Sequence, residues 1–394
     1  MNLNRRVLLW SGLGATIAAV FGREHVQDSM QEAEQAKLRK LYNPTELVQE
    51  AFQSDLKSFK DITAIQKSAK LRSPTIPYSR VWSKLLITGS KLCTEQYLRG
   101  TFEADYDGNI ASLPLYTQGF QSFKQVASFK ATEPAEETIP FEVPAFELDE
   151  LSNQFPDKLD KLGNQLDRTQ TAIQQQVKQV VKIHQKIPVY YGFLLTSPKA
   201  NILMFRGTQR QTEWLGNILA LLSPYRDPSS KAELGSVHYG IYDFYSTFLA
   251  KPVAEAVKSL DFQKPLLISG HSLGAGLATF AAMDLALLYP QLKPQIQLYA
   301  YAGPRVGNKV FIETHSQLIP NHYRVVNLAD MIPLLPISKQ LNAEFVHGGE
   351  QWSFLSYQGD IIPNHIVMTY RNAIEQEAET KLGREFENVR IPLG

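Results

Sequence analysis

The amino-acid sequence predicts an α/β fold with a mostly parallel central sheet flanked by helices. After Pro188 the chain consists of short apolar runs separated by helical segments, which is the pattern of parallel strands joined by crossover helices. Hydrophobic residues make up 44% of the chain and charged residues 20%, an ordinary globular composition. The length of 394 residues exceeds the ~250–300 residues at which single cores stop growing. We therefore expect one large domain with a helical N-terminal extension.

Charge and cysteine content exclude several classes of function. The chain has 40 basic and 39 acidic residues, a formal charge of +1, and so creates no net field that would attract nucleic acid. The single cysteine, Cys93, cannot form an internal disulfide or supply a thiolate metal cluster. We expect neither a nucleic-acid partner nor a thiolate metal site.

Residues 1–22 resemble an export signal or a membrane anchor. Asn4-Arg5-Arg6 precedes the uncharged stretch Val7–Phe21, and a basic start followed by ~7–15 apolar residues is typical of a signal peptide. The stretch is short for a membrane span, which needs ~20 apolar residues. The paired arginines are similar to a twin-arginine signal, although no small-residue cleavage site is evident. Export or membrane association is expected, and a buried N-terminal helix in a cytoplasmic protein stays open.

The first half of the chain reads as helical and polar segments. Residues 23–80 are expected to be a polar helical N-terminal extension, with solvated helices over Asp28–Lys70. A helical apolar pattern over Val81–Arg99 begins the main domain, residues 81–394. Three prolines among acidic residues predict a linker or surface loop over Ser128–Glu150. Lys158–Ile183 has the apolar spacing of one amphipathic helix, so residues 128–186 form a polar helical insertion. Three roles are open for that helix: it packs on its own domain, it caps the active site, or it recruits a partner helix.

The second half contains the predicted sheet. A turn at Ser197-Pro198-Lys199 joins the first two strands, and a helix follows the third. The expected strands are Val189–Leu195, Asn201–Phe205, Pro265–Ser269, Ile296–Tyr301 and Tyr323–Asn327, and the expected helix is Ala275–Leu288.

The segment Ser269–Gly274 places a G-x-S-x-G motif between a predicted strand and a predicted helix. A serine hydroxyl is a weak nucleophile until a sharp turn exposes it beside a base. Gly270 and Gly274 allow that turn, because side chains there would collide with the adjacent strand and helix. The pattern predicts Ser272 as a nucleophile, while a purely structural turn is the alternative.

An activated serine needs a histidine and an acid, which follow it along the chain in folds with this motif. Asp330 follows the strand Tyr323–Asn327 and would lie at the strand's carboxyl end, where catalytic loops collect. His365 precedes a segment that could close the domain and is the preferred base. His347 is the other histidine downstream of Asp330, and a lone histidine is more often structural.

Two segments could supply hydrogen-bond donors to the oxyanion of a tetrahedral intermediate. The first is the backbone N–H of Leu273, directly after the nucleophile. The second is the loop Arg206-Gly207-Thr208 after the predicted strand, where Gly207 allows close approach and Thr208 offers an N–H and a hydroxyl. A simple strand-terminating turn is the alternative for Thr208.

Several motifs together resemble the class 3 lipase family, which includes fungal triacylglycerol lipases and plant phospholipase A1-type enzymes. They span roughly residues 189–370. The matching segments are Phe205-Arg206-Gly207-Thr208 with Glu213-Trp214 and Asn217, Gly270–Gly274, Tyr301–Asn308, Asn327–Pro333 and His347–Trp352. The resemblance implies an α/β-hydrolase fold, the triad Ser272, Asp330 and His365, and an oxyanion hole at Thr208 and Leu273. It also implies a lipase that cleaves glycerolipid acyl esters through an acyl-enzyme, without metal or cofactor.

The chain departs from the family pattern in two places. Ala275 stands where the family has a second glycine, but the residue is still small. The region Val126–Lys186 is longer and more polar than its family counterpart, which leaves the substrate open.

By position in the family, Leu219–Ser236 is either a lid, with Leu221, Leu222 and Tyr225 covering an acyl groove, or an ordinary exposed connection. Transient contact with a lipid surface is expected. A catalytically silent module of the same fold, binding lipid or a protein partner, is the alternative to an enzyme.

Overall fold

The computed structural model describes residues 66–103, 105–131, 189–207, 222–336, 339–340, 343–357, 364–376 and 382–384. The signal-like segment 1–22, the extension up to residue 65 and the amphipathic helix expected over Lys158–Ile183 lie outside these ranges. Within them, no helix has both the length and the apolar character that a bilayer crossing requires.

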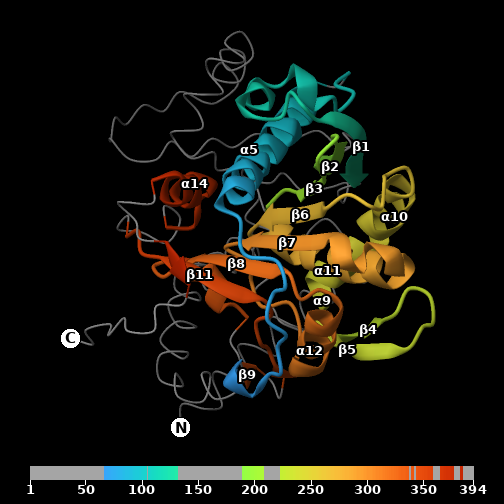
Figure 1. Ribbon diagram of the computed structural model, residues 1–394, viewed down its shortest axis with the longest axis vertical. Coiled ribbons are helices and arrows are strands. Elements are labelled where there is room, and N and C mark those ends of the chain that lie inside the picture. Colours follow the sequence, from blue (N-terminus) through green and yellow to red (C-terminus); the bar gives the residue numbers. More distant parts are fainter. Residues whose placement is uncertain are drawn as a thin grey trace, which may run out of the picture.

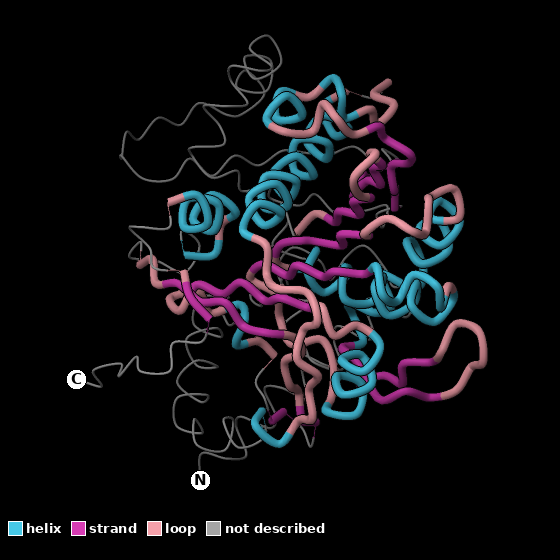
Figure 2. Tube along the Cα trace, in the orientation of Figure 1, coloured by secondary structure: helices cyan, strands magenta, loops and turns pink. Residues whose placement is uncertain are grey.

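A mixed sheet forms the centre of the described molecule (Figures 1 and 2). Its strand order is β1-β2-β3-β6-β7-β8-β11-β12. Strands β3 to β11 run parallel, whereas β1, β2 and β12 pair antiparallel at the two sides. The bounds are β1 Lys124–Ala131, β2 Val189–Thr196, β3 Asn201–Phe205, β6 Leu266–His271, β7 Ile296–Tyr301, β8 His322–Asn327, β11 Glu350–Phe354 and β12 Gly383–Arg384. The mostly parallel sheet predicted from the sequence is present.

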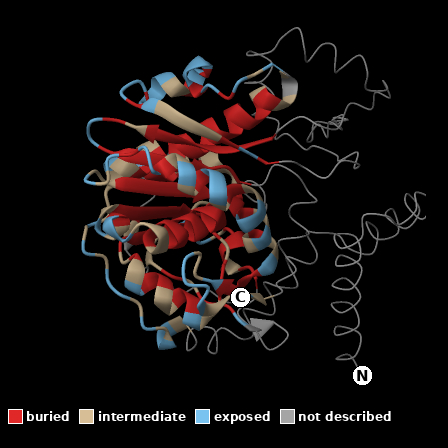
Figure 3. Cartoon of the chain, turned by 90° about the vertical axis from the view of Figure 1, so that its right-hand side faces the viewer, coloured by how far each residue is buried: buried red, intermediate tan, exposed pale blue. Residues whose placement is uncertain are grey.

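Helices cover both faces of the sheet, and each face has its own core. On one face pack α9 (Tyr239–Phe244), α10 (Ala250–Val257), α11 (Leu273–Leu288) and α12 (Lys309–Leu318), and on the other α5 (Arg80–Phe102) and α14 (Val367–Glu375). Successive strand residues point to opposite faces: Leu194 and Leu203 join the first core, while Phe193 and Met204 join the second. The central strands are therefore buried on both sides (Figure 3), which explains their continuous apolar runs.

The loop expected from Ser128 begins too early. Residues 128–131 belong to strand β1, which pairs with β2 over Lys124–Ala131. Phe129 and Ala131 are buried, and the Ser128 hydroxyl donates to the carbonyl of Gly108 at 2.8 Å. The prolines that suggested a loop lie further along the chain, outside the described residues. The composition was judged over all of Ser128–Glu150, and this concealed the short strand at its start.

The last part of the expected N-terminal extension is not a solvated helix. Residues 66–68 are helical, but residues 70–79 contain no helix. The backbone N–H groups of Thr75 and Ile76 both donate to the Asn321 side chain at 2.9 Å. Tyr78 stacks on Trp352 with ring centroids 4.3 Å apart. We call residues 66–79 the strap, and its contacts make it part of the main domain.

Candidate active site

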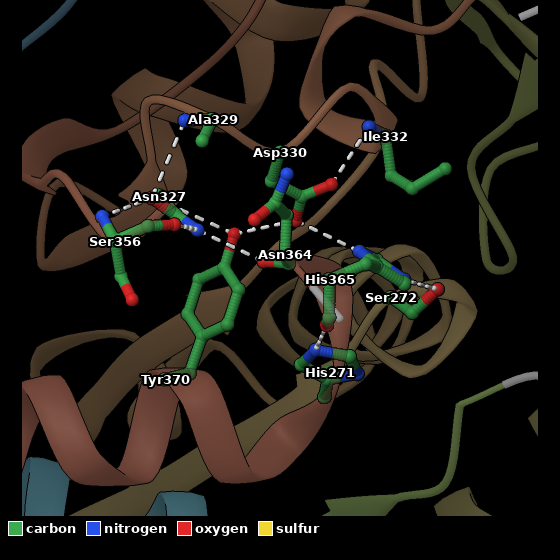
Figure 4. Close-up of polar contacts among 10 residues, drawn as sticks. All are labelled: His271, Ser272, Asn327, Ala329, Asp330, Ile332, Ser356, Asn364, His365 and Tyr370. Carbon is green, nitrogen blue, oxygen red and sulfur yellow. Dashed lines mark hydrogen bonds and ion pairs between the residues drawn. The ribbon is translucent and has the colours of Figure 1, made fainter. Parts of the chain in front are cut away.

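Ser272 occupies the sharp turn between strand β6 and helix α11. Its backbone adopts φ 58° and ψ −126°, a conformation that costs a non-glycine residue of order 1–3 kcal/mol. The N–H of Ser272 donates to the carbonyl of Tyr301 at 2.9 Å, so the neighbouring strand holds the turn in place. The hydroxyl points toward His365 (Figure 4).

Glycines on both sides of Ser272 permit this turn. A Cβ atom on Gly270 would lie 2.2 Å from the carbonyl oxygen of Gly274, and one on Gly274 would lie 2.5 Å from the carbonyl oxygen of Phe205. Both distances are too short for any side chain. The G-x-S-x-G spacing therefore reflects the close packing of β6, α11 and the end of β3.

Three side chains from distant parts of the chain form one hydrogen-bonded series (Figure 4). His365 Nε2 lies 2.8 Å from Ser272 Oγ, and His365 Nδ1 lies 2.8 Å from Asp330 Oδ2. An acceptor on Nδ1 favours the tautomer with its proton there, which leaves the Nε2 lone pair facing the serine hydroxyl. The Asp330 side chain is fully buried. The structure brings together the serine, acid and histidine that the sequence singled out.

The Asp330 carboxylate has two further hydrogen-bond donors. The Tyr370 hydroxyl donates to Oδ2 at 2.6 Å, and the backbone N–H of Ile332 donates to Oδ1 at 2.9 Å. Burial and then the Asp330 charge raise the pKa of Tyr370 well above its usual value, so the hydroxyl keeps its proton. A buried carboxylate is tolerated when its oxygens are hydrogen-bonded in this way.

Sequence reasoning missed Tyr370. It lies on α14, five positions after His365, and belongs to no motif considered. Its hydroxyl also accepts the backbone N–H of Asn327 at 3.0 Å. Two hydrogen bonds from one hydroxyl connect the acid loop to the helix that follows the histidine.

His271 was also missed, as the variable position of the serine motif. Its Nε2 lies 2.7 Å from the carbonyl oxygen of His365. Burial, followed by the neighbouring His365, lowers the pKa of His271 well below its usual value. The ring is therefore neutral and donates its Nε2 proton to that carbonyl, which fixes the backbone beneath the His365 ring.

Asn327 connects the loops that carry Asp330 and His365. Its Nδ2 donates to the carbonyls of Ser356 and Asn364 at 2.8 and 2.9 Å. Its Oδ1 accepts the N–H of Ser356 at 2.9 Å. One buried amide thus ties the end of β8 to the residues after β11 and before α14 (Figure 4).

The two expected oxyanion donors differ in what can be described. Leu273 is the first residue of α11, and the exposed N–H groups of a helix N-terminus favour negative charge. Thr208 lies outside the described residues. Gly207, just before Thr208 in the sequence, lies close to the serine turn. A Cβ atom on Gly207 would lie 2.8 Å from the carbonyl oxygen of His271.

Arg206 anchors the backbone at the end of strand β3. Its guanidinium lies between the rings of Tyr97 and Tyr191, 4.3 and 3.8 Å from their centroids. It donates to the carbonyls of Tyr190 and Gly207 at 3.0 and 2.9 Å. This buried charge rigidifies the segment next to Ser272.

The alternative base, His347, lies elsewhere. Its Nε2 is 2.6 Å from the carbonyl oxygen of Pro333, and its backbone N–H and C=O bind the Gln66 side chain at 2.8 Å each. Burial, followed by the charges of Arg324 and Arg305, lowers its pKa well below the usual value. His347 therefore has a structural position.

The described part of the lid candidate, residues 222–236, belongs to a β-hairpin and is not a free cover. Strands β4 (Leu222–Arg226) and β5 (Glu233–His238) pair antiparallel and contact α12 (Figure 1). Tyr225, expected to cover an acyl groove, is completely buried, and its hydroxyl donates to Asp284 at 2.5 Å. Residues 219–221 lie outside the described ranges.

Neither a metal centre nor a reactive thiol is evident among the described residues. They contain no group of three or more histidine, cysteine, aspartate or glutamate side chains suited to hold a metal ion. Cys93 is buried, and burial raises the pKa of its thiol well above the usual value. The site is thus described by its serine, histidine and carboxylate groups.

Comparison with known proteins shows that part of the chain is similar to a known family. The model of the family "Lipase (class 3)" matches residues 202–340. That range includes the strand before Ser272, the serine itself and Asp330. This part of the chain is similar to the class 3 lipase family.

Proteins similar to this chain come from plants and fungi. It is 30% identical over 149 residues to the chloroplastic phospholipase A(1) DAD1 of Arabidopsis thaliana, covering 34% of this chain and 33% of that protein. It is 33% identical over 161 residues to the secreted mono- and diacylglycerol lipase A of Penicillium cyclopium, covering 39% and 48%. The match thus spans a third to a half of these relatives. The triacylglyceride lipase structure of Rhizomucor miehei aligns at 26% identity with a TM-score of 0.36, covering 42% of this chain and 62% of that one.

Proposed function

We propose that the protein is a serine carboxylic-ester hydrolase that works through an acyl-enzyme. The continuous hydrogen-bonded series from Ser272 through His365 to Asp330 carries this proposal. A serine hydroxyl on a strained turn, with an imidazole lone pair at 2.8 Å and a buried carboxylate behind it, is the arrangement that activates a serine. A serine kept for structure alone would need neither partner.

In the proposed reaction Ser272 Oγ attacks the ester carbonyl carbon while His365 Nε2 takes its proton. The carbonyl π-electrons move to oxygen, and the oxyanion is stabilised by the N–H of Leu273 and by Thr208. Collapse of the intermediate breaks the bond to the alcohol, which leaves with the proton from His365. Water then attacks the acyl-enzyme in the same way and releases the fatty acid and free Ser272. Asp330 stays ionised and holds the imidazole.

The proposed substrates are acyl esters of glycerolipids, either acylglycerols or membrane phospholipids and galactolipids. The support is the pair of relatives named as a phospholipase A(1) and as a mono- and diacylglycerol lipase. Such substrates form aggregates, so we propose transient contact with a lipid surface. One of these relatives is named as chloroplastic and the other as secreted. Together with the basic and apolar start of the chain, this supports export or membrane association.

The chemistry is tested with a fluorophosphonate probe and a chromogenic acyl ester. Wild-type protein should be labelled and should turn over the ester, while Ser272→Ala should lose labelling and at least ~10³-fold in kcat/KM. Ser246→Ala is the matched control, because Ser246 is an exposed serine on another helix, and it should behave as wild type. Labelling that persists in Ser272→Ala would place the nucleophile elsewhere. An inert, unlabelled wild type would favour a silent lipid- or partner-binding module.

The substrate class is tested separately with lipids. Glycerolipid mixtures are analysed before and after incubation with wild-type protein and with Ser272→Ala. Serine-dependent release of fatty acid from one lipid class supports the glycerolipid proposal. Turnover of soluble esters with no release from any glycerolipid would contradict it.

A further inference from the structure

A small, partly open cavity lies on the α11–α12 face of the sheet, behind the serine turn. Its volume is about 20 Å³, enough for one water-sized or slightly larger occupant. Ala275, in the first turn of α11, forms part of its wall together with Thr279 and Gly303. On the sheet side the wall is formed by His322 and Arg324, which share one face of β8 because they are two positions apart.

The polar side chains of this cavity have unused hydrogen-bonding atoms. Both ring nitrogens of His322 and the Nε of Arg324 are buried and have no hydrogen-bond partner among the residues that the structure describes. His322 is 4% and Arg324 8% exposed. A buried polar atom without a partner costs roughly 1–3 kcal/mol, so donors gathered around one cavity indicate an occupant.

Charge indicates what that occupant is. Within the described part of the chain, the Arg324 guanidinium has one side-chain partner, the neutral amide oxygen of Gln351 at 2.5 Å. Burial, followed by the charge of Arg305, lowers the pKa of Arg324 to about 9, so this guanidinium is still charged at neutral pH. An isolated charge in a protein interior is strongly unfavourable unless an opposite charge accompanies it.

The neighbouring histidines supply neutral donors rather than more charge. Burial, followed by His315 and Arg324, lowers the pKa of His322 well below its usual value. The His315 ring lies edge-on to His322 with centroids 5.3 Å apart, and burial lowers the pKa of His315 to about 4. A neutral imidazole still has one N–H. The cavity therefore combines one positive charge with N–H donors.

We propose that this cavity is a binding site for a small inorganic monovalent anion, with chloride as the physiological candidate. The anion accepts the Nε–H of Arg324 and one ring N–H of His322, and it neutralises the guanidinium. It stabilises the folded domain by compensating the buried charge of Arg324 behind the catalytic serine. A water molecule would meet the same donors but would leave the charge uncompensated.

The proposal is tested by the melting temperature of the full-length protein at constant ionic strength. Chloride replaces gluconate from 1 to 300 mM, and the melting temperature should rise by at least ~3 °C, since a ligand that binds the native state stabilises it by mass action. Arg324→Gln should abolish the rise, whereas Arg226→Gln, the same substitution at an exposed position of β4, should retain it. Equal melting temperatures in chloride and gluconate, or a rise that persists in Arg324→Gln, would overturn the proposal.

A second measurement needs no variant and stays informative if Arg324→Gln does not fold. Crystals of wild-type protein are grown or soaked with sodium bromide, and data are collected at the bromine absorption edge. An anomalous peak within hydrogen-bonding distance of Arg324 Nε supports the site. A cavity without anomalous signal at saturating bromide would show that water occupies it and would refute the anion.

Discussion

Tyr370 shows how one hydroxyl can set the geometry of a buried carboxylate, that of Asp330. It donates to Asp330 Oδ2 and accepts from the backbone of Asn327, while its ring packs edge-on against His271 with centroids 5.4 Å apart. Asp330, His365 and His271 are thereby fixed relative to each other. We regard Tyr370 as a positioning residue, since it reaches the reacting atoms through Asp330.

We expect Tyr370→Phe to lower kcat roughly 10–100-fold and to leave KM nearly unchanged. The substitution removes a hydrogen bond to a charged group, worth ~1.5–3 kcal/mol, and each 1.36 kcal/mol is about tenfold in rate. The ring remains, so the fold is retained. Steady-state kinetics on a soluble acyl ester measure the effect.

Tyr289→Phe is the control for this prediction. The Tyr289 hydroxyl also donates to an oxygen, the carbonyl of Ala254 at 2.9 Å, but at the far end of α11. Its loss should leave kcat unchanged. A Tyr370→Phe enzyme with wild-type kcat would show that Ile332 and His365 hold the Asp330 carboxylate without help.

At the scale of elements, helix α11 is anchored to the β4–β5 hairpin by a buried carboxylate. Asp284 on α11 is 7% exposed and accepts a hydrogen bond from the hydroxyl of Tyr225 on β4. Burial raises its pKa to about 6, although the hydrogen bonds from Tyr225 and Tyr245 act in the opposite direction. The stem of the hairpin is therefore coupled to the helix that begins at the catalytic turn.

This raised pKa predicts a pH-dependent contribution to stability. The folded state holds the Asp284 proton up to about pH 6, while the unfolded chain releases it near 3.9. The stabilisation from protonated Asp284 is fully present below the pKa of Asp284 in the unfolded chain. It is lost as pH rises through the pKa of Asp284 in the folded state. Relative to Asp284→Asn, the wild-type free energy of unfolding should fall by about 2 kcal/mol between pH 4 and 7.

Urea denaturation at several pH values measures this difference. Comparing two variants cancels the opposite pH dependence of the buried histidines. Asp243→Asn, an exposed aspartate on α9, should show no such trend against wild type. If the difference in free energy of unfolding between wild type and Asp284→Asn did not change across this pH range, Asp284 would have the same pKa in the folded and unfolded states.

At the scale of the molecule, the strap packs across several strands of the sheet. Tyr78 contacts three aromatic rings from three strands, Tyr299, Tyr323 and Trp352. Gln66, at the other end, binds both backbone groups of His347. Residues that precede α5 in the sequence thus hold β7, β8 and β11 together.

We expect Tyr78→Ala to lower the free energy of unfolding by about 3 kcal/mol, in the range of large aromatic truncations. Chemical denaturation of the full-length protein measures it. Tyr357→Ala is the control, since Tyr357 is 73% exposed, and it should change stability by less than about 0.5 kcal/mol. Equal stability of the two variants would show that the strap is peripheral to the fold.

The sequence by itself determined five strands of the sheet (β2, β3, β6, β7 and β8), the serine turn and the three residues that meet there. Strands such as Asn201–Phe205 and Ile296–Tyr301 were predicted at their observed bounds, because burial on both faces leaves a continuous apolar run. Ser272 was identifiable because its turn needs glycines at fixed spacing. Asp330 and His365 followed from chain order and from their places at element ends.

The tertiary structure alone decided which other residues complete the site. Tyr370, His271 and the strap act through contacts between segments far apart in sequence, such as the 40 positions from Asp330 to Tyr370. No local pattern encodes such a contact, because a side chain's partner depends on how helices and strands pack. The same holds for Tyr225, whose position suggested a mobile cover but whose hydroxyl is buried on Asp284. Periodicity and spacing report local geometry, whereas long-range hydrogen bonds exist only in the folded molecule.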